Sequence, residues 1–240
     1  MVNITVKQFE KDNRNHIEYW LDHALYYPVD EPVDMEYNLP RKFDAQLPKN
    51  LRRFSLLHST VKLLRHINLN NSKKIIDIGA GFGDFALLKN YFDFERLDAT
   101  DPGILQYNFL KTYMKDYYTN IYDLGIEDIN LQCYDTAIIL GCWAPSFRLA
   151  LEKYVFQTNI RTIVIYGTYM NCKNFTELES SSITYAGNWK YNTDSNHTFL
   201  GKNFLDLVMR GNGFRLDSCF ELSIYIDKGN SKYILQYTKK

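Results

Sequence analysis

Three closely spaced glycines and one aspartate are the residues of this sequence with the clearest chemical meaning. Gly79, Gly81 and Gly83 follow the run 73–78, which is typical of a short buried strand. Eighteen residues after Gly83, Asp101 ends a second strand-like run. A glycine turn lets the backbone approach a ligand closely, and a carboxylate after the next strand can bind both hydroxyls of a ribose. Together they predict a site for a nucleoside-bearing cofactor at the carboxyl edge of a parallel sheet.

The spacing of the glycines argues against a dinucleotide. A dinucleotide fingerprint is Gly-x-Gly-x-x-Gly, whereas here the third glycine comes one position earlier and Asp84 takes its place. A carboxylate at that point would repel a pyrophosphate. The pattern Asp-x-Gly-x-Gly-x-Gly, which begins at Asp77, resembles motif I of the class I S-adenosylmethionine-dependent methyltransferases, whose cofactor carries no phosphate. The alternative is a glycine turn that binds nothing.

This resemblance implies S-adenosyl-L-methionine as the cofactor and S-adenosyl-L-homocysteine as its product. By the family pattern, Asp77 would orient the glycine turn or meet the cofactor amino group, and Asp101 would accept both ribose hydroxyls. The segment 125–128 would place an apolar residue beside the adenine and an acidic one, Glu127 or Asp128, near its exocyclic amine. The cofactor-binding residues expected in this way are Asp77, Gly79, Ala80, Gly81, Gly83, Asp101, Pro102, Ile126, Glu127 and Gly141.

Composition limits the other classes of function. The chain has 240 residues and is 45% hydrophobic, enough to bury the core of one α/β domain. Its 28 basic and 28 acidic side chains cancel, so no net field attracts nucleic acid or an anionic membrane. The four cysteines and five histidines show no metal-ligand spacing, so no metal is expected. A charged N-terminus and the lack of a run of about 20 apolar residues predict a cytoplasmic protein without a membrane span.

Strand and helix patterns alternate from residue 73 onward. This alternation predicts an α/β fold with a Rossmann-like, doubly wound sheet of about seven strands. The link 227–231 is too short for a crossover, so the last strand should run antiparallel. The order is that of class I methyltransferases, and the resemblance covers about residues 70–240. Strands are expected at 73–78, 94–101, 119–124, 134–140, 161–166, 214–227 and 232–238, and helices at 83–92, 103–116, 146–158 and 200–210.

Residues 1–72 lack this alternation and are expected to form a helical arm or lid, which leaves 73–240 as the methyltransferase-like domain. A helix is expected over 7–27, an extended proline-containing connection over 28–48, and a helix with an apolar stripe over 50–67. The stretch 49–74 holds basic residues and no acidic ones. It is either a solvated helix face or a surface for an anion, so it keeps nucleic acid open as a partner.

The insertion 167–199 should determine the substrate. Its aromatic, amide and hydroxyl side chains suit a polar ligand with an apolar face, such as a sugar ring, although a surface loop can have the same composition. Trp143, after the fourth strand, is either a wall of the active site or ordinary packing. The substrate-binding residues expected are Trp143, Tyr169, Trp189, Asn192 and His197.

Methyl transfer from a sulfonium is a direct displacement, so the enzyme must align the reactants and exclude water. A hydroxyl acceptor would also need a general base. His197 is the leading candidate because an ordinary histidine titrates near neutral pH, although a histidine in a loop can be incidental. Tyr169 and Asp194 are the other candidates for this catalytic role.

These residues predict methyl transfer to a polar small molecule, in first place a hydroxyl of a carbohydrate or nucleotide-linked sugar. A second resemblance keeps a tRNA substrate open: the segment 101–107 is similar to the enzymes that carboxymethylate the tRNA wobble uridine, although the segment 143–145 departs from their histidine-bearing motif. A catalytically silent cofactor-binding subunit is another alternative, as is a homodimer. A nicotinamide-dependent enzyme is disfavoured by Asp84 and by the final strand pair.

Overall fold

The structure is a computed structural model that describes residues 2–23, 49–83, 85–140, 151–170, 202–227 and 230–239. The strands are β1 (Lys74–Ile78), β2 (Arg96–Thr100), β3 (Asn120–Tyr122), β4 (Thr136–Leu140), β5 (Thr162–Met170), β6 (Phe214–Asp227) and β7 (Asn230–Lys239). The α-helices are α1 (Val6–Asp12), α2 (Arg14–His23), α4 (Lys49–His66), α5 (Ile104–Tyr113) and α8 (Lys202–Gly211). Short 3-10 helices are η1 (Ala86–Asn90), η2 (Ile126–Asp128) and η3 (Leu131–Cys133), and η4 (Leu151–Val155) is a turn of π-helix.

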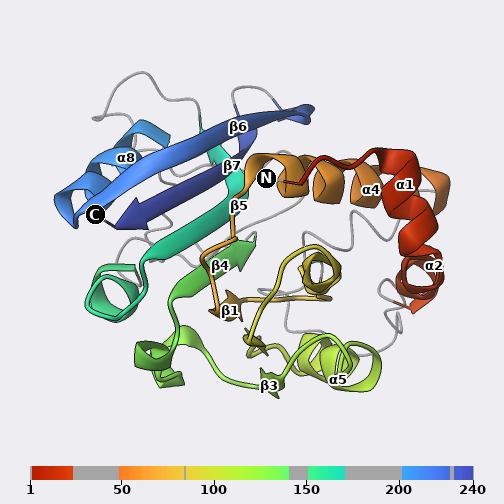
Figure 1. The fold of residues 1–240 in the computed structure, drawn as a ribbon, viewed down its shortest axis with the longest axis horizontal. Coiled ribbons are helices and arrows are strands. Elements are labelled where there is room, and N and C mark those ends of the chain that lie inside the picture. Colours follow the sequence, from red (N-terminus) through yellow and green to blue (C-terminus); the bar gives the residue numbers. More distant parts are fainter. Residues whose placement is uncertain are drawn as a thin grey trace, which may run out of the picture.

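All strands of the described chain join one sheet in the order β3-β2-β1-β4-β5-β7-β6 (Figure 1). Strands β1 to β5 pair in parallel, whereas β7 runs antiparallel to both β5 and β6. Parallel neighbours need crossover connections, which the helices between the strands provide. The expected α/β class, the seven strands and the antiparallel last strand are thus confirmed.

The two faces of the sheet bury different sets of side chains. One face carries Ile75, Leu97 and Val164 and packs against the arm helices, η1 and α5. The opposite face carries Ile76 and Ile139 and packs against η4 and α8. Successive strand residues point to opposite faces, and both faces of this largely parallel sheet are covered. Figure 1 shows α8 beside β6 and β7, away from α1, α2 and α5.

The arm is part of the same core as the sheet. Phe9 of α1 and Ile17 of α2 are fully buried in the cluster that also holds Ile75 of β1. The helix expected over 7–27 is divided at Asn13, and its residues 24–27 lie outside the described part. The Asn13 amide donates to the Phe9 carbonyl at 2.9 Å and to the Tyr91 hydroxyl at 2.7 Å. Such a side chain competes with the helical backbone, which accounts for the break.

The two arginines described in the basic stretch hold the arm in place. Arg53 of α4 forms ion pairs with Glu10 of α1 and Glu18 of α2. Arg65 donates from its guanidinium to the carbonyl of Ile4 at 2.6 and 2.8 Å. These internal partners argue against anion binding by Arg53 and Arg65. None of the helices in the described ranges has the length and hydropathy that a bilayer crossing requires.

Two expected elements have different bounds in the structure. The helix expected over 83–92 is reduced to the 3-10 helix η1, and the φ of 76° at Gly83 excludes this residue from a right-handed helix. The expected insertion at 167–199 begins later, because β5 continues to Met170 beside β7, with Met170 opposite Asn230. Residues 171–199 lie outside the described part. The helix expected over 146–158 is described only from 151, where it forms η4.

Candidate functional site

The turn after β1 is left-handed at each of its three glycines. The φ angles are 66° at Gly79, 58° at Gly81 and 76° at Gly83, a region that other residues rarely adopt. The amides of Gly79 and Ala80 both donate to the carbonyl of Thr100, at 2.9 and 3.0 Å. These bonds fix the turn against the end of β2, at the edge of the sheet where ligands of open α/β folds bind.

Asp101 connects this turn to the start of α5. One carboxylate oxygen accepts from the amide of Gly81 at 2.7 Å, and the other accepts from the amide of Gly103 at 2.9 Å. The Asp101 amide donates to the carbonyl of Tyr122 at 3.1 Å. The structure therefore brings together Asp101 and the glycine turn, as the sequence predicts. Asp101 is half-buried.

Gly83 has a packing reason to be glycine as well as a conformational one. A Cβ atom there would lie 3.1 Å from Met114 Cγ, 3.2 Å from Leu110 Cδ2 and 3.5 Å from Tyr118 Cε2. The first two separations are tighter than ordinary van der Waals contact. This glycine lets the end of the turn approach α5 and the segment after it closely.

Asp77 lies below the turn and is fully buried on β1. The Tyr118 hydroxyl donates to its Oδ2 at 2.6 Å, and Tyr118 itself is buried. A buried carboxylate needs donors, because removing a charge from water is costly. Sequence reasoning missed Tyr118, since it lies 41 residues from Asp77 and its neighbour Tyr117 has the same side chain.

The loop expected near the adenine is tied to the same edge of the sheet. The Thr100 hydroxyl at the end of β2 donates to the carbonyl of Leu124, just before η2. Ile126 is half-buried, while Glu127 and Asp128 are exposed. The Glu127 carboxylate folds over Gly125, where a Cβ would lie 2.5 Å from Glu127 Oε1. An apolar side chain and an acidic pair are thus available at this edge, as the family pattern implies.

The remaining expected residues are described in part or not at all. Ala80 is buried within the turn, and Pro102 is exposed between Asp101 and Gly103. Tyr169 lies in β5 opposite Ser231. The expected residues outside the described part are Asp84, Gly141, Trp143, Trp189, Asn192, Asp194 and His197.

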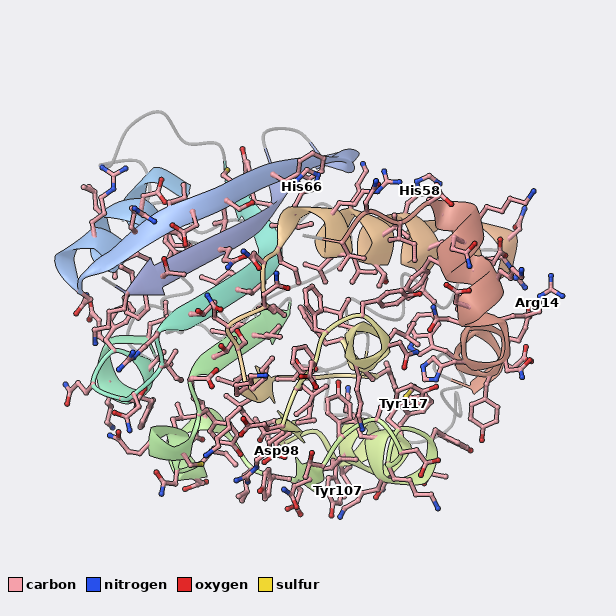
Figure 2. All side chains as sticks on the ribbon, viewed as in Figure 1. Arg14, His58, His66, Asp98, Tyr107 and Tyr117 are labelled. Atoms are coloured by element: carbon pink, nitrogen blue, oxygen red, sulfur yellow. The ribbon has the colours of Figure 1, made fainter. Side chains whose placement is uncertain are left out.

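A second buried aspartate that the sequence reasoning did not single out lies on β2. Asp98 is fully buried and accepts from the Arg96 guanidinium at 2.6 and 2.7 Å and from the Tyr134 hydroxyl at 2.6 Å. Asn120 and Tyr122 of β3 donate to the same carboxylate at 3.1 and 3.3 Å. Burial and the Asp98 carboxylate raise the pKa of Tyr134, and the hydrogen bond to Asp98 raises the pKa of Arg96. These residues form an internal polar network, whose position Figure 2 marks by Asp98.

The edge of the sheet is suited to a ligand with a nucleoside and without phosphate. Residues 77–83 and 101–103 include two carboxylates and no lysine or arginine that could neutralise a pyrophosphate. The carboxylate of Asp101 can accept hydroxyl donors, and the glycine backbone leaves room for close approach. This chemistry fits S-adenosylmethionine better than it fits a dinucleotide.

No family model matches this sequence, and no curated protein sequence matches it significantly. Among solved structures, it resembles the magnesium protoporphyrin IX methyltransferase ChlM from Synechocystis with bound SAM, at 12% identity and a TM-score of 0.55 over 100% of both chains. It also resembles the O-methyltransferase of a trans-AT PKS multienzyme from Brevibacillus brevis with S-adenosyl-L-homocysteine, at 10% identity and a TM-score of 0.56 over 89% of this chain and 81% of that one.

A further neighbour is the N-methyltransferase NodS from Bradyrhizobium japonicum, at 9% identity and a TM-score of 0.52, with 76% of this chain and 94% of that one covered. By their names, these neighbours modify different acceptors. The likeness therefore concerns the fold: the chain has the fold of class I S-adenosylmethionine-dependent methyltransferases, as motif I predicts.

Proposed function

We propose that this protein is an S-adenosylmethionine-dependent methyltransferase whose cofactor binds at the turn 79–83. The observation that carries the proposal is the left-handed glycine turn joined to Asp101 through the amide of Gly81. It lies at the carboxyl edge of β1 and β2, in a sheet with the methyltransferase strand order. When bound, the cofactor supplies a methyl group on a sulfonium, which an acceptor takes by direct displacement.

The residues of the chain would bind and orient the cofactor. The Asp101 carboxylate, already held by two backbone amides, would accept the ribose hydroxyls without a large loss of side-chain entropy. Ile126 would contact one face of the adenine, and Glu127 or Asp128 would accept from its amine. The glycines would allow the backbone to approach the amino-acid part, and Pro102 and Gly141 would complete the walls.

Calorimetric titration tests the cofactor directly. We expect micromolar binding of S-adenosylhomocysteine and no binding of NAD. Replacing Asp101 with alanine should weaken S-adenosylhomocysteine binding by about 1–3 kcal/mol, the usual range for a hydrogen bond to a charged group. Asp93→Ala is the control, because Asp93 is 98% exposed and its contact with Lys73 is a surface ion pair. An unaltered protein that binds neither S-adenosylmethionine nor S-adenosylhomocysteine would refute the proposal.

For the acceptor, we propose a polar small molecule in the cytoplasm, with a carbohydrate or nucleotide-linked sugar hydroxyl as the leading class. The support is the aromatic and amide composition of the segment 171–199, with Trp143, Trp189 and Asn192 as contacts. His197 would be the general base, with Tyr169 or Asp194 as alternatives. Release of S-adenosylhomocysteine should be measured with sugars, nucleotide sugars, amines and tRNA as candidate methyl acceptors. Turnover with amines alone would exclude the hydroxyl acceptor, and binding without turnover would favour a silent subunit.

A tRNA substrate is the second candidate, and the arm bears on it. The basic stretch 49–74 was the main sequence argument for a polyanion. Arg53 and Arg65 bind Glu10, Glu18 and the carbonyl of Ile4, although Lys74 of the same stretch is exposed. Nucleic-acid affinity depends on positive charges that can reach phosphates. The balance of 28 basic and 28 acidic side chains in the whole chain therefore favours the small molecule over tRNA.

A further inference from the structure

We infer that Tyr118 is a positioning residue for the cofactor site, which it serves by fixing both ends of the glycine turn through Asp77 and Gly83. The inference rests on the proposed function, because it assigns a role toward the same cofactor. Tyr118 is only 4% exposed, and its contacts are with Asp77 and with Gly83, at the two ends of a turn whose residues 80–83 are themselves buried.

One edge of the Tyr118 ring reaches both ends of the turn. Its hydroxyl donates to Asp77 Oδ2 at 2.6 Å, and its Cε2 lies 3.5 Å from the position of a Cβ on Gly83. Cε2 is the ring carbon next to the one that bears the hydroxyl, so both contacts use the same edge. Asp77 precedes the first glycine by two residues and Gly83 is the last glycine. Tyr118 therefore spans the turn from below.

The middle of the turn is held by other groups. Gly79 and Ala80 donate to the Thr100 carbonyl, and Gly81 donates to Asp101. The amide of Gly83 donates within the turn, to the carbonyl of Ala80 at 2.9 Å. Packing at the far end of the turn comes from the α5 side, through Leu110, Met114 and Tyr118. Of these three, Tyr118 is the one with a polar link to the other end.

The same contacts favour one of the two roles expected for Asp77. A carboxylate that is 0% exposed and accepts a buried hydroxyl at the start of the turn is placed to orient the turn. Hydrogen bonds to a charged acceptor at this length are among the strong ones in proteins. Loss of the hydroxyl would remove this bond to Asp77 and so loosen the link between the two ends of the turn.

The segment that carries Tyr118 is itself anchored. The Tyr118 amide donates to the Met114 carbonyl at 3.2 Å, and the Thr119 amide donates to the Leu97 carbonyl of β2 at 2.6 Å. The preceding residue, Tyr117, packs edge-on against His16 of α2, with 4.4 Å between ring centroids. Because the residues on both sides of Tyr118 are fixed, its ring can restrain the turn.

The structure offers a matched control for the decisive variant. Tyr134→Phe removes a buried hydroxyl that also donates to a fully buried aspartate at 2.6 Å, but in the network around Asp98. Tyr118→Phe and Tyr134→Phe should both unfold at lower urea concentration than the unaltered protein. Only Tyr118→Phe should weaken S-adenosylhomocysteine binding, by about tenfold, the loss of one hydrogen bond. A purely structural hydroxyl would change the urea midpoint and leave the dissociation constant unchanged.

The outcomes separate this inference from the proposed function. If the unaltered protein does not bind S-adenosylhomocysteine, the proposed function fails. If it binds and Tyr118→Phe binds equally well, or both tyrosine variants weaken binding equally, Tyr118 is not a positioning residue.

A second measurement needs no variant and applies even if Tyr118→Phe does not fold. In the unaltered protein, saturating S-adenosylhomocysteine should slow hydrogen exchange at the amides of Tyr118 and Thr119, which lie below the turn. Exchange at the Tyr134 amide serves as the internal control. Binding that leaves exchange at 118–119 unchanged would overturn the inference.

Discussion

Two buried aspartates of this protein accept a tyrosine hydroxyl at the same distance, on opposite faces of one sheet. Asp77 accepts from Tyr118 and Asp98 accepts from Tyr134, both at 2.6 Å, and both carboxylates are fully buried. Their surroundings differ. Asp98 also forms an ion pair with the Arg96 guanidinium and accepts hydrogen bonds from Asn120 and Tyr122. The tyrosine that serves Asp77 packs instead against the last glycine of the turn.

The difference shows that the same hydrogen bond can serve two purposes. Around Asp98, a cation and several donors converge on one carboxylate, which compensates its charge and joins β2 to β3 and to Tyr134. That network is complete within the fold. The pair of Asp77 and Tyr118 instead lies at a glycine turn, whose left-handed backbone is joined to Asp101 through the amide of Gly81. What lies beside each pair, rather than the pair itself, indicates its role.

The largest effect should come from removing the centre of the Asp98 network. Asp98→Ala leaves the Arg96 guanidinium and the Tyr134 hydroxyl without their acceptor. Breaking a buried ion pair typically costs about 3–5 kcal/mol, and the 32% exposure of Arg96 places this case near 3–4 kcal/mol. Urea unfolding would measure the loss. The folded fraction should bind S-adenosylhomocysteine normally. A large loss of affinity would contradict the view that the Asp98 network serves only stability, whereas the pair of Asp77 and Tyr118 serves the cofactor site.

Acid should lower the free energy of unfolding through His16, which packs on the same side of the sheet as Tyr118. Burial lowers the pKa of His16, beside Tyr117, from 6.5 to about 4. Between these values the unfolded chain binds more protons than the folded protein. The contribution of His16 is therefore complete above pH 6.5 and declines as the pH falls, by about 3 kcal/mol at pH 4.

Urea unfolding of the parent protein and of His16→Gln at several pH values would isolate this contribution. Carboxylates and the other histidines titrate in both proteins, so the difference between the two curves belongs to His16. It should depend on pH between 6.5 and 4 and be constant above. Parallel curves throughout would show that His16 is not buried in its neutral form.

A smaller effect should follow from Gly83→Ala. The substitution places a Cβ at a φ of 76° and within 3.1 Å of Met114 Cγ. Strain and overpacking together should cost about 2 kcal/mol of unfolding free energy. Because the turn must move, S-adenosylhomocysteine binding should weaken as well. Gly213→Ala is the control, since Gly213 also has a positive φ, of 81°, but has open space around it and lies before β6, away from the turn.

Much of the fold could be predicted from local patterns. A short aliphatic run followed by a glycine turn marks β1, and a link too short for a crossover requires antiparallel pairing of β6 and β7. The contact between Asp101 and the glycine turn was also predictable, because the carboxyl ends of adjacent parallel strands meet at one edge. These features depend on the order of strands, turns and links along the sequence.

Features that depend on distant packing could not be predicted. Tyr118 is one of 19 tyrosines, and its partner Asp77 becomes known only when α5 is placed over β1. The kink at Asn13 depends on Tyr91, and the shortened η1 on the conformation of Gly83. Sequence reasoning treated buried Asp98 as an ordinary strand residue, because its donors come from three separate segments.

The bond between Asn13 and Tyr91 also has a consequence for synthesis on the ribosome. These residues lie 78 positions apart, and Phe9 stacks on the same tyrosine. At about 5–20 residues per second, roughly 4–16 s pass between their translation. During that interval, Asn13 and Phe9 lack their contacts with Tyr91, whereas α4, which also contacts α1 and α2 of the arm, is translated earlier. The contact of the arm with Tyr91 can thus form only after its contact with α4.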